Sequence, residues 1–261
     1  MGIAGLAGSG DGLPVLGWDP GGDWRFVFST RIGGLSHGPF RSLNLGFTTG
    51  DFSEAVRVNR QRLLAAFGVD PWKCSLAFPQ HGTLMVRAEH RGVLEQGKDP
   101  PGDGIWTDDP SRALLTLTAD CIPIAVVRDH PPAMAVVHAG WRSLIGDIGT
   151  AVATALGGAP LRAALGPAIG PCCFSVSADL ARRFRDGFGH AAASADHHVD
   201  LWACAAQQLT AAGCQVEKIY RYCTCCESER FFSQRRDGRR TGRQGVLGFA
   251  RMRTGAGTAR T

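Results

Sequence analysis

The sequence predicts a single-domain α/β fold with a mixed sheet. Short apolar runs rich in Val, Ile, Leu, Ala and Thr alternate with longer segments whose apolar residues recur at helical spacing. No repeat of fixed period and no clear linker interrupts the 261 residues. Because the two kinds of element are interleaved along the chain, one layered α/β domain accounts for the whole pattern.

Strands are predicted where such an apolar run is bounded by Gly, Pro or polar residues. Three runs lie close together in the middle of the chain: two of them flank Cys121, and the third ends at His138. Each is apolar enough for a buried strand. In chain order, the other strands are expected at residues 24–30, 75–78, 83–88, 161–165, 216–222 and 246–250, with a short extended piece at 42–46.

Helices are predicted where apolar residues fall on one face between start and stop signals. Ser53 and Ser177 are suited to cap the first and third helices, and Gly213 ends the fourth. The second helix follows directly after His138-Ala139-Gly140-Trp141-Arg142. The four helices are expected at residues 53–67, 143–156, 177–188 and 201–212.

The expected domain covers residues 18–250, between a flexible Gly-rich leader at 1–17 and a basic flexible tail at 251–261. No apolar run approaches the roughly 20 residues that cross a bilayer, and the N-terminus lacks a signal-peptide pattern. These features predict a cytoplasmic protein without a membrane partner. Nine cysteines are an odd number for a disulfide framework, so reduced thiols are expected, including the adjacent pairs Cys172-Cys173 and Cys225-Cys226.

Three side chains far apart in the sequence are candidate metal ligands. Cys121 and His138 lie where strands give way to turns, and His81 lies upstream in Phe-Pro-Gln-His-Gly. A His-Cys-His set suits zinc and leaves a fourth position open for water or substrate. The alternative is a small buried cysteine and structural histidines, since the spacing matches no local zinc motif. A further zinc site at Cys223, Cys225 and Cys226 is not favoured, because no second half of a Cys-x-x-Cys pair accompanies them.

The basic residues predict an anionic partner. The formal net charge is +5, and two ligand classes compete: nucleic acid, or a small phosphorylated or phosphate ligand. A helix starting near Ser143 offers free N–H groups to an oxyanion, and Arg142 adds a full charge. Arg31 leaves a strand beside a Gly-Gly turn and could also reach an anion, or it could lie on the surface. Few aromatic residues accompany the C-terminal arginines, so nucleic acid is not expected.

Several longer motifs resemble those of one known family, over residues 25–250. The family is the laccase-domain family, variously called multicopper polyphenol oxidase, purine nucleoside phosphorylase or peptidoglycan editing factor. In this sequence the motifs are Thr30-Arg31-Ile32-Gly33-Gly34, Ser42-Leu43-Asn44-Leu45-Gly46, His81-Gly82, Thr118-Ala119-Asp120-Cys121-Ile122-Pro123, His138-Ala139-Gly140-Trp141-Arg142, Gly166-Pro167-Ala168-Ile169-Gly170-Pro171-Cys172-Cys173, Cys223-Thr224, Phe231-Phe232-Ser233 and Thr241-Gly242-Arg243.

The resemblance implies a four-layer α/β/β/α sandwich, usually monomeric, in which His81, Cys121 and His138 bind zinc. It also implies that Arg31 and Asn44 line the pocket near the metal. The sequence departs from the family pattern at three places. Pro79 stands where Gln is usual before the first zinc histidine, Ser143 replaces a common Gly, and Gln244 replaces a common Met.

The resemblance implies a zinc-dependent enzyme that acts on purine nucleosides. Expected reactions are phosphorolysis of adenosine, inosine and methylthioadenosine, and hydrolytic deamination of adenosine by zinc-activated water. Asp120 is a candidate acid for the leaving ammonia, and Arg31, Arg142 and Ser143 are candidates for binding phosphate. Copper-dependent phenol oxidation is an alternative, but the scattered histidines lack the His-x-His pairs of a multicopper centre. Peptidoglycan-precursor editing is a third possibility that the sequence does not separate from the first.

Overall fold

Two mixed β-sheets form the centre of the protein, as seen in a computed structural model that describes residues 12–89, 92–97, 99–158 and 160–251. Within these residues the first sheet has the strand order β1-β2-β11-β6-β3, and the second has the order β10-β9-β7-β8-β5-β4. Most neighbouring strands are antiparallel, whereas β3 with β6, β4 with β5, and β9 with β10 are parallel. Both sheets are therefore mixed.

The strands follow the predicted apolar runs closely. Those of the first sheet are β1 (Val15–Trp18), β2 (Trp24–Ser29), β3 (Cys74–Leu76), β6 (Ala113–Thr118) and β11 (Gln244–Ala250). Those of the second are β4 (Met85–Arg87), β5 (Gly104–Thr107), β7 (Ile122–Arg128), β8 (Ala133–Ala139), β9 (Leu161–Leu165) and β10 (Cys214–Ile219).

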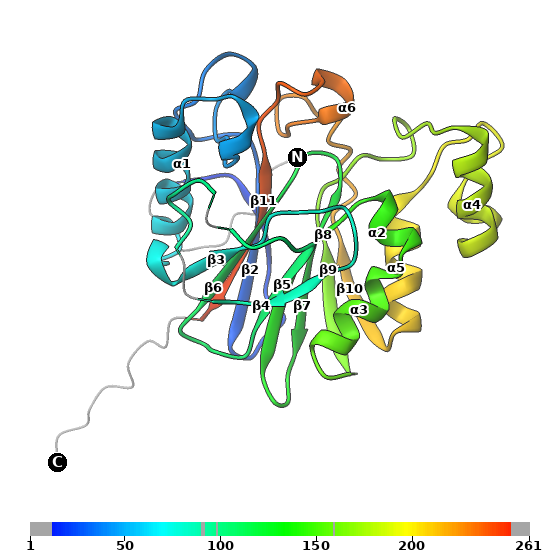
Figure 1. Cartoon of the computed structure of the whole chain (residues 1–261), viewed down its shortest axis with the longest axis horizontal. Coiled ribbons are helices and arrows are strands. Elements are labelled where there is room, and N and C mark those ends of the chain that lie inside the picture. The colour runs from blue at the N-terminus through cyan, green and yellow to red at the C-terminus, as the bar shows by residue number, and fades with distance from the viewer. Residues whose placement is uncertain (1–11, 90–91, 98, 159, 252–261) are drawn as a thin grey trace.

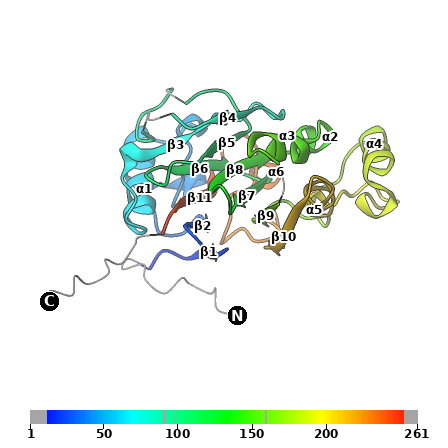
Figure 2. The same cartoon turned by 90° about the horizontal axis from the view of Figure 1, so that it is seen from below.

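Helices cover the outer face of each sheet (Figures 1 and 2). The first sheet packs against α1 (Ser53–Ala65), and the second against α2 (Trp141–Ile145), α3 (Ile148–Ala155) and α5 (Leu201–Ala211). The connection between β9 and α5 contains α4 (Ala178–Phe188), and α6 (Gln234–Asp237) is a single short turn before β11. The four-layer α/β/β/α arrangement implied by the family resemblance is confirmed.

Neighbouring residues of a strand belong to different core clusters, because successive side chains point to opposite faces of the sheet. Phe26 and Phe28 of β2 lie between the two sheets, whereas Val27 faces α1. In β8, Val136 lies between the sheets and Val137 faces the helices of the other side. Both faces of each sheet are therefore buried, which explains why the strands read as continuous apolar runs rather than as alternating ones.

Some predicted boundaries are wrong. Residues 15–17 belong to β1, which pairs with β2, so the predicted leader at 1–17 extends too far; residues 1–11 and most of the predicted tail lie outside the described residues. The predicted helix at 143–156 is broken into α2 and α3, because Asp147 adopts a left-handed backbone and its side chain caps α3. Residues 42–46 form no strand, and Ser53 lies inside α1 without acting as its N-cap.

Two chain crossings from the first sheet to the second position the site described next. The loop after β3 leads through His81 to β4, and the turn after β6 leads through Asp120 and Cys121 to β7. In the same sheet as β7, residue His138 pairs with Pro123. Among the described residues, no helix has the length and apolarity to cross a membrane.

Candidate metal centre and cavity

The structure brings His81, Cys121 and His138 together. One ligand atom from each lies within 4.8 Å of the other two, and the two imidazole rings meet edge to face with centroids 4.8 Å apart. His81 is held in a left-handed backbone conformation at φ 58° in its loop, whereas His138 is fixed within β8. These are soft and borderline ligands of the kind that bind zinc or a related transition metal.

Gly140 keeps the space between these ligands open. A Cβ atom at this position would lie 3.0 Å from the Cys121 sulfur and 3.4 Å from Nδ1 of His81. The backbone of Gly140 has φ −92°, which any residue adopts, so glycine is not needed there for conformational reasons. Its absence of a side chain instead leaves room between a thiol and an imidazole, as a shared ion requires.

Asp103 lies behind the ligands. Its backbone oxygen accepts a hydrogen bond from the amide of His138 at 2.7 Å, and its Oδ1 accepts one from the amide of Gln80 at 3.0 Å. The carboxylate is buried, and Oδ1 lies 3.9 Å from Nδ1 of His138. Neither Nδ1 of His138 nor Oδ2 of Asp103 has a hydrogen-bond partner. A carboxylate behind a metal-binding histidine is a common arrangement, since it orients the ring.

The protonation of the three ligands suits metal binding. Burial lowers the pKa of His138 to about 3, so its imidazole is neutral near pH 7 and retains a lone pair for a metal. Burial also lowers the pKa of His81, with a further contribution from Arg142. Burial and the nearby Asp120 raise the pKa of Cys121 to about 12. A metal ion bound here therefore displaces the thiol proton.

The three ligands open into a cavity of about 770 Å³, which lies in the usual range for small-molecule sites. Aromatic rings of Phe47, Phe78, Trp141 and Phe174 form part of its lining. Arg142, Arg235 and Arg243 line the same cavity as His81, Cys121 and His138. The site thus combines a metal-binding corner, aromatic surface and positive charge.

Two predicted phosphate-binding residues, Arg31 and Ser143, do not line this cavity. Arg31 donates to the backbone oxygens of Arg41 and Ser228, so its guanidinium holds loops together. Ser143 is buried, and its hydroxyl accepts a hydrogen bond from the amide of Gly140. The helix that it joins, α2, has only five residues. A phosphate site at Arg31 and Ser143 is therefore not supported, whereas Arg142 does line the cavity.

Asn44 does not line the cavity, but it contacts Arg243, which does. It is fully buried, and its Oδ1 accepts hydrogen bonds from the amides of Gly46 and Arg243 at 2.9 Å and 2.8 Å. The guanidinium of Arg243 donates to the backbone oxygens of Thr241 and Gly242. Asn44 therefore positions the backbone of a cavity arginine rather than contacting a ligand in the cavity.

Asp120 lines the cavity, but both of its carboxylate oxygens already accept hydrogen bonds from other residues of the chain. Oδ1 accepts from the Thr224 hydroxyl and Oδ2 from the backbone amide of Arg235, each at 2.6 Å. The residue itself has a left-handed backbone at φ 91° beside Cys121. This geometry favours a positioning role for Asp120, which joins three loops, over the acid role predicted from the sequence.

Sequence reasoning did not single out Asp103, Arg235 or Arg243 as site residues. Arg243 lies in the recognised Thr-Gly-Arg motif, so that motif was the available signal. Asp103 precedes a short strand and resembles an ordinary loop residue. Its proximity to His138 depends on the pairing of β5 with β8, in which Gly104 lies opposite Val137.

Comparison with known proteins agrees with this fold. A purine nucleoside phosphorylase of Xylella fastidiosa is 36% identical over 256 residues, covering 90% of this chain and 95% of that protein. The purine nucleoside phosphorylase YfiH of Shigella flexneri is 34% identical, covering 82% of this chain and 89% of that protein. The crystal structure of the Bacillus licheniformis hypothetical protein YfiH superposes with a TM-score of 0.82 at 27% identity, covering 87% and 93% of the two chains.

The family model described as "multi-copper polyphenol oxidoreductase laccase" matches residues 25–250, which include every cavity residue discussed above. The chain therefore belongs to this laccase-like family, whose curated relatives similar to this chain bear the name purine nucleoside phosphorylase.

Proposed function

We propose that the protein is a zinc-dependent purine nucleoside enzyme, which cleaves adenosine, inosine and methylthioadenosine with phosphate and also deaminates adenosine. The observation that carries this proposal is the convergence of His81, Cys121 and His138 at one corner of an arginine-containing cavity. The names of the similar relatives supply the reaction class.

The donor set fits zinc. Two imidazoles and one thiolate form a three-ligand set that leaves a fourth tetrahedral position open, as in catalytic zinc sites. The space beside Gly140, which borders the Cys121 sulfur and Nδ1 of His81, agrees with an ion at this place. Zinc bound there would supply Lewis-acid chemistry and activate water for hydrolysis.

The cavity lining contains both aromatic and cationic side chains, and the guanidinium groups of Arg142 and Arg235 lie against the rings of Trp141 and Phe174. Phe78 and Phe174 offer aromatic surface to a purine ring, which is flat and stacks well on such faces. Arg142 and Arg243 offer charge to phosphate, and both influence the protonation of His81. In phosphorolysis, a phosphate oxygen bonds to the sugar carbon as the bond to the purine nitrogen breaks. The arginines hold the phosphate and offset its charge in that step.

Copper oxidation of phenols fits the geometry less well. A multicopper oxidase needs a blue-copper site and a separate His-rich cluster. Among the described residues, the clusters able to hold a metal are one with two histidines and a cysteine, and one of cysteines alone. Phosphorolysis and deamination are therefore the better-supported reactions.

The direct test combines metal analysis with product analysis. Purified protein of known metal content is incubated with adenosine, with and without phosphate. We expect adenine and ribose-1-phosphate only when phosphate is present, and inosine in either case. Oxidation of phenols that depends on added copper, without nucleoside turnover, would contradict the proposal. Turnover of a peptidoglycan precursor alone would also contradict it.

Replacing Asp103 by asparagine is expected to weaken zinc binding by about 10- to 100-fold, as the loss of an outer carboxylate does at other zinc sites. The side chain keeps its shape and can still accept from Gln80, but it loses the charge beside Nδ1 of His138. Competition with a chelator measures the affinity. Asp108→Asn is the matched control, since Asp108 is paired with Arg87 on the surface and should leave zinc affinity unchanged.

Replacing Arg142 by glutamine is expected to raise the KM for phosphate about 10- to 100-fold, which corresponds to losing one charge-assisted hydrogen bond. The KM for the nucleoside should change little, because the aromatic residues that line the cavity are unchanged. Steady-state kinetics with each substrate varied in turn measure the two constants. Arg57→Gln, which alters an exposed arginine of α1 paired with Glu54, serves as the control. Equal effects on both KM values would argue against a phosphate role for Arg142.

A further inference from the structure

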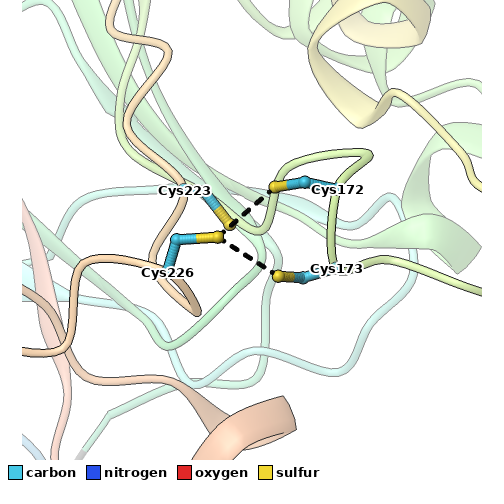
Figure 3. A group of neighbouring side chains, drawn as sticks. All are labelled: Cys172, Cys173, Cys223 and Cys226. Carbon is cyan, nitrogen blue, oxygen red and sulfur yellow. Dashed lines mark hydrogen bonds between the residues drawn. The ribbon is translucent and has the colours of Figure 1, made fainter.

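A second group of side chains, carried by two loops, converges outside the three-ligand group. The sulfurs of Cys172, Cys173, Cys223 and Cys226 all lie within 4.8 Å of one another, and their side chains point toward one another (Figure 3). All four are free cysteines in the structure. The sequence predicted free thiols at Cys172-Cys173 and Cys225-Cys226 and did not favour a zinc site at Cys223, Cys225 and Cys226.

The pairing of two strands explains why the four cysteines meet. β9 and β10 are parallel neighbours, with Leu165 opposite Ile219. The loops that follow parallel strands leave the sheet at the same edge, so the loop carrying Cys172 and Cys173 meets the loop carrying Cys223 and Cys226. A bridge between Ala168 and Cys223 continues the parallel pairing beyond the strands.

The distances between the sulfurs suit one tetrahedral ion. Sγ of Cys226 lies 3.5 Å from Sγ of Cys172 and 3.3 Å from Sγ of Cys173. Zinc–sulfur bonds of about 2.3 Å place tetrahedral sulfur ligands roughly 3.8 Å apart. Small side-chain adjustments therefore convert the group into a four-cysteine site. Such a site is closed, since all four positions are filled by protein.

The surrounding backbone also suits thiolate ligands. The amide of Gly170 donates a hydrogen bond to Sγ of Cys223 at 3.2 Å, and hydrogen bonds of this kind orient metal-binding groups. A Cβ atom on Gly170 would lie 3.2 Å from Sγ of Cys172 and 3.3 Å from Cβ of Cys223. The glycine therefore allows the two cysteine loops to approach closely.

We propose that Cys172, Cys173, Cys223 and Cys226 bind a structural zinc ion, at a site separate from His81, Cys121 and His138. The ion ties together two loops that no disulfide joins in the structure. The inference rests on the four-sulfur geometry and does not depend on which reaction the cavity performs.

This ion would stabilise one wall of the cavity. Thr224, between the cysteines of the second loop, donates a hydrogen bond from its hydroxyl to Oδ1 of Asp120. Arg235 donates through its guanidinium to the backbone oxygen of Cys173 and through its amide to Asp120. Both cysteine loops are thus bonded to groups that hold the turn before Cys121. The structural ion therefore fixes the turn that presents a ligand of the first site.

Metal analysis of matched variants tests the proposal. Full-length protein purified without chelators is expected to carry two zinc ions per chain, measured by plasma mass spectrometry. The double variant Cys172→Ser/Cys226→Ser should lose one ion, and Cys121→Ala should lose the other. Cys225→Ser alters the neighbouring cysteine outside the four-sulfur group and should retain both. An unchanged zinc content in the double variant would overturn the proposed four-cysteine site. If Cys121→Ala then still lost its ion, the proposed zinc site of the cavity would stand.

A second measurement covers the case in which the double variant does not fold. Metal-depleted Cys121→Ala protein retains the four-cysteine group and is titrated with Co²⁺. We expect one equivalent to bind with the strong thiolate-to-cobalt absorption of a tetrahedral four-sulfur site, and one equivalent of zinc to displace it. A disulfide among the four cysteines, found by mass spectrometry of the freshly purified protein, would overturn the proposal. An iron–sulfur cluster at this place would overturn it as well.

Discussion

Replacing Cys121 by alanine is expected to lower kcat/KM for adenosine phosphorolysis and deamination by at least about a thousand-fold, or about 4 kcal/mol in transition-state stabilisation. Cys121 is the only thiol of the three-ligand group, and its sulfur borders the space beside Gly140. Without it, two histidines remain, and they hold zinc too weakly to keep it in the cavity. Zinc content and initial rates are measured on the same preparation.

The control for this variant is Cys214→Ala. Cys214 is a buried cysteine at the start of β10, outside both cysteine-containing ligand groups of the described residues. Its substitution also removes a thiol but should leave zinc content and rates close to those of the parent protein. If Cys121→Ala retained full zinc content and turnover, the proposed role of the three-ligand group would be wrong.

Replacing Gly140 by alanine is expected to reduce zinc content and activity by about a hundred-fold or more while the protein remains folded. The added Cβ would lie 3.0 Å from the Cys121 sulfur and 3.4 Å from Nδ1 of His81. An ion bonded to both groups at about 2.0–2.3 Å needs that space. The backbone at φ −92° accepts alanine, so we expect only a small change in the free energy of unfolding. Metal analysis, activity and thermal unfolding are measured together.

Gly187→Ala is the matched control for Gly140→Ala. Gly187 lies in α4, and an added Cβ there meets no atom within 4 Å. Alanine favours a helix over glycine by about 1 kcal/mol, so this variant should be slightly more stable and fully active. If Gly140→Ala were largely unfolded, its loss of zinc would follow from the loss of the fold. That result would contradict a specific effect of the added Cβ on the metal ligands.

Most strands could be predicted from local sequence, because a buried strand needs a continuous apolar run and turns need Gly, Pro or polar residues. The runs around Cys121 and before His138 became β6, β7 and β8. The helix predicted at 143–156 was the main error within this region. Its break depends on Asp147, whose side chain accepts from the amide and hydroxyl of Thr150 and caps a new helix.

The roles of polar residues were harder to predict than the elements. Arg31 and Arg142 are both arginines beside glycine-containing motifs, yet only Arg142 lines the cavity. Arg31 instead donates to backbone oxygens of two loops, one of which is nearly 200 residues further along the chain. Local sequence does not report which distant carbonyl groups will need a hydrogen-bond donor, so it does not distinguish a structural arginine from a ligand-binding one.

The sequence by itself determined the α/β class, the sites where strands end, and the residue types able to bind a metal, because these follow from local hydrophobicity and side-chain chemistry. Only the tertiary structure decided which of these groups meet. His81 reaches Cys121 because two crossings between the sheets bring them together, and Cys172 reaches Cys226 because β9 and β10 are parallel neighbours. Strand order depends on contacts between segments far apart in the chain, which no local pattern specifies.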